Sequence, residues 1–181
     1  MHPEIISLCL FMFVTSCSPG PNNILASYSG FNFGILKTIP HMLGVIFGFT
    51  SLVVIMNFGL INVFQKFPVI QEILKYTGSL FLVYLAYKIS FSKSGKNDNI
   101  KNPVKFIETF FFQFINPKSV IVSVIMVSTY VEEGKFFFLY SLWVIGVAFL
   151  FAIISINFWT LVGKFLRRFA TNEKFIKRFN Y

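Results

Sequence analysis

Long apolar runs alternate with short polar segments along the whole chain. An α-helix needs about 20 apolar residues to cross the hydrocarbon core of a bilayer, and five runs approach or exceed that length. They cover residues 5–30, 38–65, 73–91, 106–131 and 136–163. The pattern predicts an all-α integral membrane protein, a helical bundle of about five transmembrane helices.

Two of these runs contain proline well inside them, and we expect both helices to be broken there. The first carries the segment SPGPNN at residues 18–23, and the fourth carries NPK at residues 116–118. Proline removes a backbone donor and its ring clashes with the preceding turn, while lipid offers no water to the freed backbone groups. Such a break persists only where protein covers it or where it lines a polar cavity, so both breaks are candidate binding sites.

The charged residues lie mostly at the ends of the apolar runs. They make up 13% of the chain, whereas a soluble domain carries about 25%. Lys93, Lys96, Lys101 and Lys105 fall between the third and fourth runs, and the positive-inside rule therefore places this loop in the cytoplasm. Five alternating spans then put the start of the chain outside and the tail at residues 164–181 inside. Orientation and contact with anionic membrane lipids account for the net charge of +9 better than a nucleic-acid partner does.

The two breaks fall at corresponding places in segments that are expected to run in opposite directions. This is the sequence pattern of a transporter built from an inverted repeat, here a 3+3 repeat whose last helix is missing. We expect one transmembrane transporter domain over residues 1–181, with repeat one at about 4–91, an incomplete repeat two at about 106–163 and a basic cytoplasmic tail at 164–181. The apolar residues of the tail could form one face of an interfacial amphipathic helix, or the tail could be frayed.

The first break offers groups that suit a zwitterion. A half-helix that begins near Asn22 presents unpaired backbone N–H groups and the positive end of its dipole, and both attract a carboxylate. Asn22 and Asn23 add amide donors and acceptors without adding charge. The alternative is a proline kink in which the two asparagines only cap the second half of the helix.

The second break brings polar side chains into the fourth run. Gln113 and Asn116 are three residues apart and are expected to share a helix face. Lys118 is costly at membrane depth unless it faces protein or water, and it could hold a substrate carboxylate or satisfy carbonyls freed by Pro117. The complete candidate substrate site is Pro19, Gly20, Pro21, Asn22, Asn23, Gln113, Asn116, Pro117 and Lys118.

Other small and polar residues inside the runs are interpreted as packing elements. Gly44 and Gly48 have the four-residue spacing that lets two helices approach closely. Asn57 and Asn157 are expected to form hydrogen bonds between helices.

The sequence lacks the groupings that an enzyme or an ATP-driven pump requires. It contains no Ser/His/Asp set, no paired carboxylates and no G-x-x-x-x-G-K-[ST] loop. Cys9 and Cys17 would lie about 12 Å apart along one helix, too far for a disulfide. His2 and His41 stand alone, without metal-ligand spacing. We therefore expect no catalytic residue, no metal and no cofactor.

The two motifs resemble the signatures of the LysE/RhtB family of amino-acid exporters. Residues 18–22 are similar to its [ST]-P-G-P-N signature and residues 116–118 to its N-P-K signature, and the resemblance runs from about residue 3 to about residue 168. Residues 19–26, 113–116 and 158–163 look closest to the cysteine/O-acetylserine exporter branch. The resemblance implies a multi-pass secondary transporter that exports a small neutral amino acid across the inner membrane of a bacterium, driven by the proton gradient.

The chain departs from this family pattern at its end. Members usually run about 20–30 residues longer and end in a further hydrophobic span. Either the chain works with five spans, for instance as a homodimer, or it is a truncated, non-transporting membrane protein or a helix-packing subunit. A lipoprotein attached through Cys17 is the least favoured alternative, because the positive n-region of a signal peptide is absent.

Overall fold

The computed structural model describes residues 3–60, 104–132 and 134–170, together with the single residues 66, 67, 69, 72, 73, 76, 80 and 83. The predicted third span at residues 73–91 lies largely outside the described residues. The basic loop at residues 92–103 and the last part of the tail, residues 171–181, lie outside them entirely.

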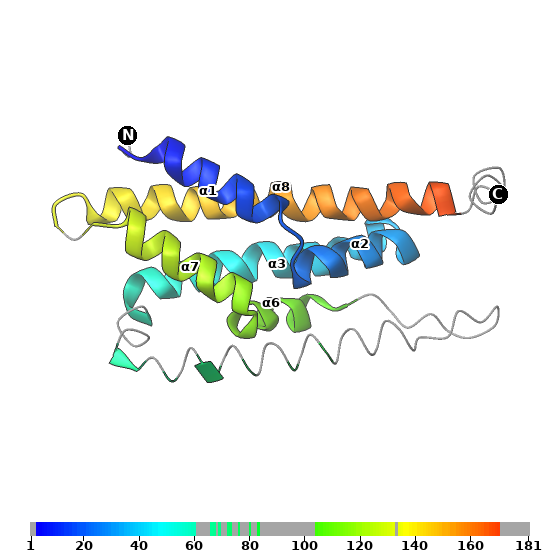
Figure 1. The fold of residues 1–181 in the computed structure, drawn as a ribbon, viewed down its shortest axis with the longest axis horizontal. Coiled ribbons are helices and arrows are strands. Elements are labelled where there is room, and N and C mark those ends of the chain that lie inside the picture. The colour runs from blue at the N-terminus through cyan, green and yellow to red at the C-terminus, as the bar shows by residue number, and fades with distance from the viewer. Residues whose placement is uncertain are drawn as a thin grey trace.

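All secondary structure in the described ranges is helical, which confirms the predicted all-α bundle. The helices are α1 (Ile5–Cys17), α2 (Pro21–Phe33), α3 (Ile35–Ile55), the π-helical turn η1 (Met56–Leu60), α6 (Phe106–Ile115), α7 (Pro117–Tyr130) and α8 (Phe137–Ala170). In Figure 1, α8 runs along most of the length of the molecule, with α2 and α3 beside it. The fold is therefore organised around one long helix, against which the shorter segments pack.

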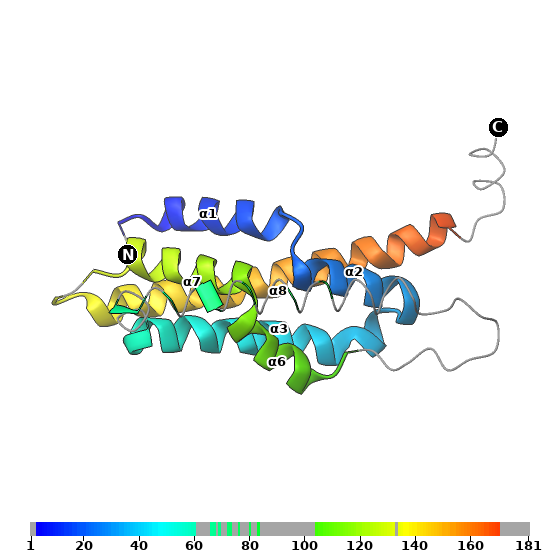
Figure 2. The ribbon, with the colours of Figure 1, turned by 60° about the horizontal axis from the view of Figure 1, so that its bottom comes forward.

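Both predicted helix breaks are present. The chain bends by 53° between α1 and α2 and by 62° between α6 and α7. Pro21 and Pro117 each stand at the first position of the second half-helix, where the missing N–H has no helical partner to lose. The two bent segments run in opposite directions: in both views the chain passes from left to right along α1 and α2, and from right to left along α6 and α7 (Figures 1 and 2).

Two helical stretches are long and apolar enough to cross a membrane without a break, namely residues 35–59 and 137–169. Each bent pair meets the same criterion if it is counted as one span. The described residues thus hold two of the five predicted spans outright, and four if both bent pairs cross.

The last helix is longer than the sequence pattern predicts. We expected the fifth span to end at Gly163, but α8 continues to Ala170, so residues 164–170 extend the same helix. Lysine, arginine and leucine favour helix as strongly as most apolar residues do. The change from apolar to basic composition therefore does not stop the helix.

Close packing of α3 on α6 depends on the two glycines that the sequence singled out. A Cβ atom on Gly44 would lie 2.7 Å from Phe106 O, and one on Gly48 would lie 2.6 Å from Phe110 O. Neither position can hold a larger residue unless the backbone of α6 shifts. The prediction that Gly44 and Gly48 pack two helices closely is confirmed.

A second glycine contact joins α2 to α8. A Cβ atom on Gly30 would collide with Thr160 O, and one on Gly163 would collide with Ser27 O. The Ser27 hydroxyl also donates to Trp159 O at 2.8 Å. The half-helix α2 is therefore held tightly to α8, as α6 is held to α3.

The two asparagines that were expected to join helices behave differently. Asn57 Nδ2 donates to Ser141 Oγ on α8 at 2.8 Å, which confirms the prediction for Asn57. Asn157 Nδ2 donates to Ile153 O of its own helix at 2.8 Å, and its side chain is exposed. The prediction of an interhelical bond was wrong for Asn157, because its side chain points away from the bundle.

Candidate functional site

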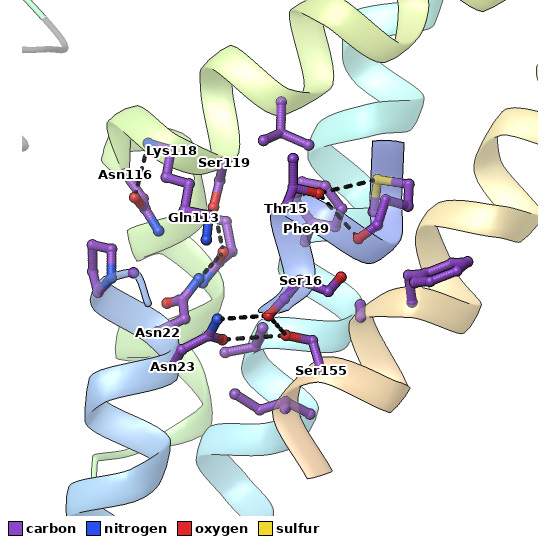
Figure 3. A pocket seen from close by; sticks show the side chains of 18 residues that line it. Thr15, Ser16, Asn22, Asn23, Phe49, Gln113, Asn116, Lys118, Ser119 and Ser155 are labelled. Carbon is purple, nitrogen blue, oxygen red and sulfur yellow. Dashed lines mark hydrogen bonds between the residues drawn. The ribbon is translucent and has the colours of Figure 1, made fainter. Parts of the chain in front are cut away.

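The two helix breaks meet through a reciprocal pair of amide hydrogen bonds. Asn22 Nδ2, in the first turn of α2, donates to Gln113 Oε1 at 2.8 Å. Gln113 Nε2, near the end of α6, donates to Asn22 Oδ1 at 3.1 Å. Two residues that are 91 positions apart in the sequence thus fix the two breaks to one another (Figure 3).

Gln113 has all of its hydrogen-bonding positions occupied. Its Nε2 also donates to Thr109 O at 2.9 Å, and its Oε1 also accepts from Ser119 Oγ at 2.9 Å. The side chain is fully buried. An amide has two donors and two acceptor positions, so Gln113 orients Asn22 and Ser119 and has no group left for a ligand.

Lys118 reaches across from the second break to the first. Its Nζ donates to Ser18 O and to Ser18 Oγ, each at 2.8 Å. The sequence left two roles open for Lys118, a substrate carboxylate or the carbonyls freed by Pro117. The structure adds a third role, because the carbonyl that Lys118 satisfies belongs to the opposite break. An ammonium group has three donors, so one donor remains for a ligand.

The glycine of the SPGPNN segment makes room for this lysine. A Cβ atom on Gly20 would lie 2.7 Å from Lys118 Cδ and 3.1 Å from its Nζ. The stem of Lys118 passes directly over the backbone of the first break. Gly20 therefore leaves room for the end of Lys118 where it contacts Ser18, and a larger residue would push that end aside.

Asn23 donates hydrogen bonds to backbone carbonyls at the end of α1. Its Nδ2 donates to Ser16 O at 3.2 Å and to Ser18 O at 3.1 Å. Ser16 O also accepts from Ser155 Oγ and from Trp159 Nε1 on α8. Carbonyls freed at the end of a helix must find other donors when they are buried. Asn23 therefore caps the first half of the broken helix, whereas the sequence alternative had both asparagines capping the second half.

Asn116 lies at the second break itself. Its backbone is extended, with φ −73° and ψ 112°, so Asn116 does not share a helix face with Gln113 as predicted. Its Oδ1 accepts from the backbone N–H of Lys118 at 3.1 Å and caps α7. Pro117 explains this conformation, because a proline disfavours the helical conformation for the residue before it, here Asn116.

A cavity lies between the two breaks, α3 and α8 (Figure 3). Its volume is about 530 Å³ when the space at its open mouth is included. Seven of the nine predicted site residues line it, namely Gly20, Pro21, Asn22, Asn23, Gln113, Asn116 and Lys118. Pro19 and Pro117 are absent from the lining and contribute by shaping the breaks. The rest of the cavity wall was not predicted from the sequence, because apolar and hydroxyl side chains give no local signal of a site. These residues are Met12, Thr15, Ser16, Val45, Phe49, Ser119, Val122, Phe151, Ala152, Ser155 and Ile156.

The electrostatics of the cavity favour a carboxylate. The first turns of α2 and α7 both contribute to the lining, and helix N-termini carry positive partial charge and N–H groups without helical partners. Lys118 is the one charged side chain among the lining residues that the structure describes. The cavity can therefore hold a small molecule that has one anionic group and a neutral or apolar remainder.

One buried residue near the site, a histidine that the sequence showed only as isolated, was not predicted to lie there. His41 on α3 is fully buried, and its Nδ1 lies 3.0 Å from Thr109 Oγ1. Its Nε2 lies 3.4 Å from Asn22 O. A lone histidine in an apolar run gives no local signal, because its partners are 19 and 68 positions away.

Within the residues that the structure describes, no three His, Cys, Asp or Glu side chains gather as a metal site would require. Cys9 and Cys17 are free thiols on α1.

An all-α bundle in which two oppositely directed broken helices enclose a polar cavity belongs to the class of membrane transport proteins. Within that class, the chain belongs to the LysE type translocator family, which its residues 13–175 match. This confirms the family resemblance seen in the two motifs.

The chain is similar to proteins described as cysteine/O-acetylserine efflux proteins. It is 29% identical over 174 residues to those of Salmonella typhimurium strain LT2 and Escherichia coli strain K12. The match covers 93% of this chain and 87% of each relative. No solved structure matches the chain significantly.

Proposed function

We propose that this protein exports small neutral amino acids, or derivatives such as O-acetylserine, from the cytoplasm across the inner membrane of a bacterium. The observation that carries the proposal is the cavity between the two breaks, which has one lysine and two half-helix N-termini in its lining. The similarity to cysteine/O-acetylserine efflux proteins supports the same substrate class.

The substrate carboxylate binds where the positive groups converge. The first turns of α2 and α7 carry the positive ends of their helix dipoles, although Asn116 Oδ1 already accepts from the backbone N–H of Lys118 in α7. Lys118 Nζ retains one donor beyond its two bonds to Ser18. A charge-assisted hydrogen bond is about twice as strong as a neutral one. These groups together replace the water that the carboxylate loses.

The substrate ammonium binds to neutral oxygen atoms close by. Asn22 Oδ1 accepts from Gln113, and Ser119 Oγ donates to Gln113, so each oxygen keeps a free lone pair toward the cavity. Because both oxygen atoms are anchored by Gln113, the ammonium position is fixed relative to the carboxylate position.

The side chain of the substrate lies against the apolar wall. Phe49, Val122 and Phe151 contribute to that wall, and the lining residues that the structure describes include no acidic one. A basic side chain would be buried there without a counter-charge, which is costly. We therefore expect cysteine and O-acetylserine to be exported and lysine to be excluded.

The transport cycle follows from the two opposed breaks. Movement of one repeat against the other would expose the cavity to each side of the membrane in turn. We include coupling to inward movement of protons in the proposal, since export against a gradient needs a driving ion.

Export from cells tests this proposal directly. Cells that express the chain are loaded with cysteine, O-acetylserine or lysine, and the appearance of each in the medium is followed. The first two should leave faster than from cells without the chain, whereas lysine should not. Unchanged efflux of all three would contradict the proposal.

A variant of Asn22, which exchanges two amide hydrogen bonds with Gln113, tests where the substrate binds. Asn22→Ala removes the reciprocal bonds to Gln113 and the ammonium position, so we expect export to fall by about tenfold or more while the protein stays in the membrane. Asn157→Ala is the matched control, because Asn157 is exposed and bonds only to its own helix among the described contacts. Wild-type export by Asn22→Ala would show that the site is elsewhere.

A further inference from the structure

Only one end of the Asn116 amide is in use within the protein. The side chain is 1% exposed, and its Oδ1 accepts from the backbone N–H of Lys118 at 3.1 Å. Its Nδ2 donates to no group in the part of the chain that the structure describes. Buried polar groups are nearly always hydrogen-bonded, so the two N–H donors of this buried amide indicate a partner from outside the chain.

The second break directs these N–H donors into the cavity. The backbone N–H of Lys118 needs an acceptor, so the oxygen of the amide must face α7 and its nitrogen must face away from that N–H group. Asn116 belongs to the lining of the cavity. Figure 3 shows the side chains of Asn116 and Lys118 extending from the second break toward Asn22 of the first. The unused donors of Asn116 thus face the space between the two breaks.

Lys118 supplies another donor beside this amide. Its Nζ has three N–H groups and gives two of them to Ser18 O and Ser18 Oγ. Lys118 and Asn116 are two residues apart at the start of α7, a helix of 14 residues whose N-terminus carries positive partial charge. A carboxylate has two oxygen atoms and accepts strongly from charged and amide donors. The start of α7 therefore offers a donor for each oxygen of one carboxylate.

We propose that Asn116 Nδ2 and Lys118 Nζ each bind one oxygen of the substrate carboxylate. Asn116 is then a binding residue as well as the cap of α7, with its oxygen holding the helix and its nitrogen holding the ligand. The inference rests on the proposed export function and names the group that every substrate must carry, a free carboxylate. Amines without that group leave the Asn116 donors unpaired, which costs binding free energy.

A helix cap alone would not require asparagine at this position. Asparagine, aspartate and serine cap helices about equally well, and each would offer an oxygen to the backbone N–H of Lys118. The three side chains differ in what they present to the cavity. Asparagine presents an NH₂ group, an ionised aspartate presents an oxygen that repels a carboxylate, and serine has no amide donor. Substitutions of Asn116 by aspartate and serine therefore separate capping from binding.

Binding by the wild-type protein tests whether the carboxylate is required. Purified protein in lipid nanodiscs is titrated calorimetrically with L-cysteine and with cysteamine, which is cysteine without its carboxylate. The loss of hydrogen bonds to a charged group should make the Kd of cysteamine higher than that of cysteine by about tenfold or more. Equal affinity for the two ligands would overturn this inference alone. Binding of neither ligand would overturn the proposed function and this inference with it.

Variants of Asn116 test which residue recognises the carboxylate. The measured quantity is the Kd of cysteamine divided by the Kd of cysteine, and Asn116→Asp and Asn116→Ser should each lower this ratio by about tenfold. Their thermal unfolding midpoints should stay at the wild-type value, because each variant keeps an oxygen that caps α7. Asn157→Ser is the matched control and should keep both the ratio and the midpoint, because Asn157 is exposed and bonds only to its own helix among the described contacts. A wild-type ratio in either Asn116 variant would overturn the inference, and Asn116→Ser decides alone if Asn116→Asp does not fold.

Discussion

At the scale of single residues, the site depends on contacts that cross from one break to the other. Lys118 of the second break binds Ser18 of the first, and Gln113 binds Asn22. The sequence identified these polar residues because proline chemistry is local and marks where the helices break. It could not show that Lys118 reaches Ser18, because the two residues are 100 positions apart. It also did not indicate that the Asn23 side chain caps the end of α1.

Gly20 supports a prediction at this scale. In Gly20→Ala the new methyl group would meet Lys118 Cδ at 2.7 Å and would displace the lysine from Ser18. A hydrogen bond to a charged group contributes about 1.5–3 kcal/mol, so we expect export to fall by about tenfold or more. The measurement is efflux of O-acetylserine normalised to protein in the membrane.

Ser18→Ala provides the comparison for this substitution. It removes one acceptor of Lys118 and adds no volume, so its loss of export should be smaller than that of Gly20→Ala. Equal export by Gly20→Ala and the wild type would contradict the role assigned to the contact between Lys118 and Ser18.

At the scale of helices, the sequence predicted the breaks better than the ends. Both second halves begin at proline, which is a strong local signal. The apolar span was expected to end at Gly163, with either an interfacial helix or a frayed tail beyond it, and α8 continues to Ala170 because helix propensity does not fall where composition changes at Lys164. Gly163 is not a stop signal, since it provides the contact with α2.

Two glycines on α8 allow a matched test of this packing. A Cβ atom on Gly163 would collide with Ser27 O, whereas one on Gly146 would meet no described residue within 4 Å. Gly163→Ala should therefore lose about 1–3 kcal/mol of stability through overpacking. Gly146→Ala should be as stable as the wild type or slightly more stable, because alanine favours helix over glycine.

The thermal unfolding midpoint of each purified variant in detergent measures the difference. A lower midpoint for Gly163→Ala alone supports the close contact between α2 and α8. Equal midpoints for the two variants would mean that α2 does not lie against α8 at Gly163.

At the scale of the whole molecule, the sequence predicted the class of fold and the family, and both are confirmed. The length of the apolar runs is enough to predict the fold class, and the two short motifs are enough to predict the family. The shape of the cavity required the structure, because its apolar wall comes from α1, α3, α7 and α8 together.

We propose that one cavity between the two breaks binds a neutral amino acid, and equilibrium binding tests this most directly. Purified protein is incubated with radiolabelled O-acetylserine, and bound ligand is measured by scintillation proximity with unlabelled competitors. We predict saturable binding that cysteine displaces and lysine does not, and that Asn22→Ala abolishes while Asn157→Ala leaves it unchanged. Undiminished binding by Asn22→Ala, or equal displacement by lysine, would contradict the account.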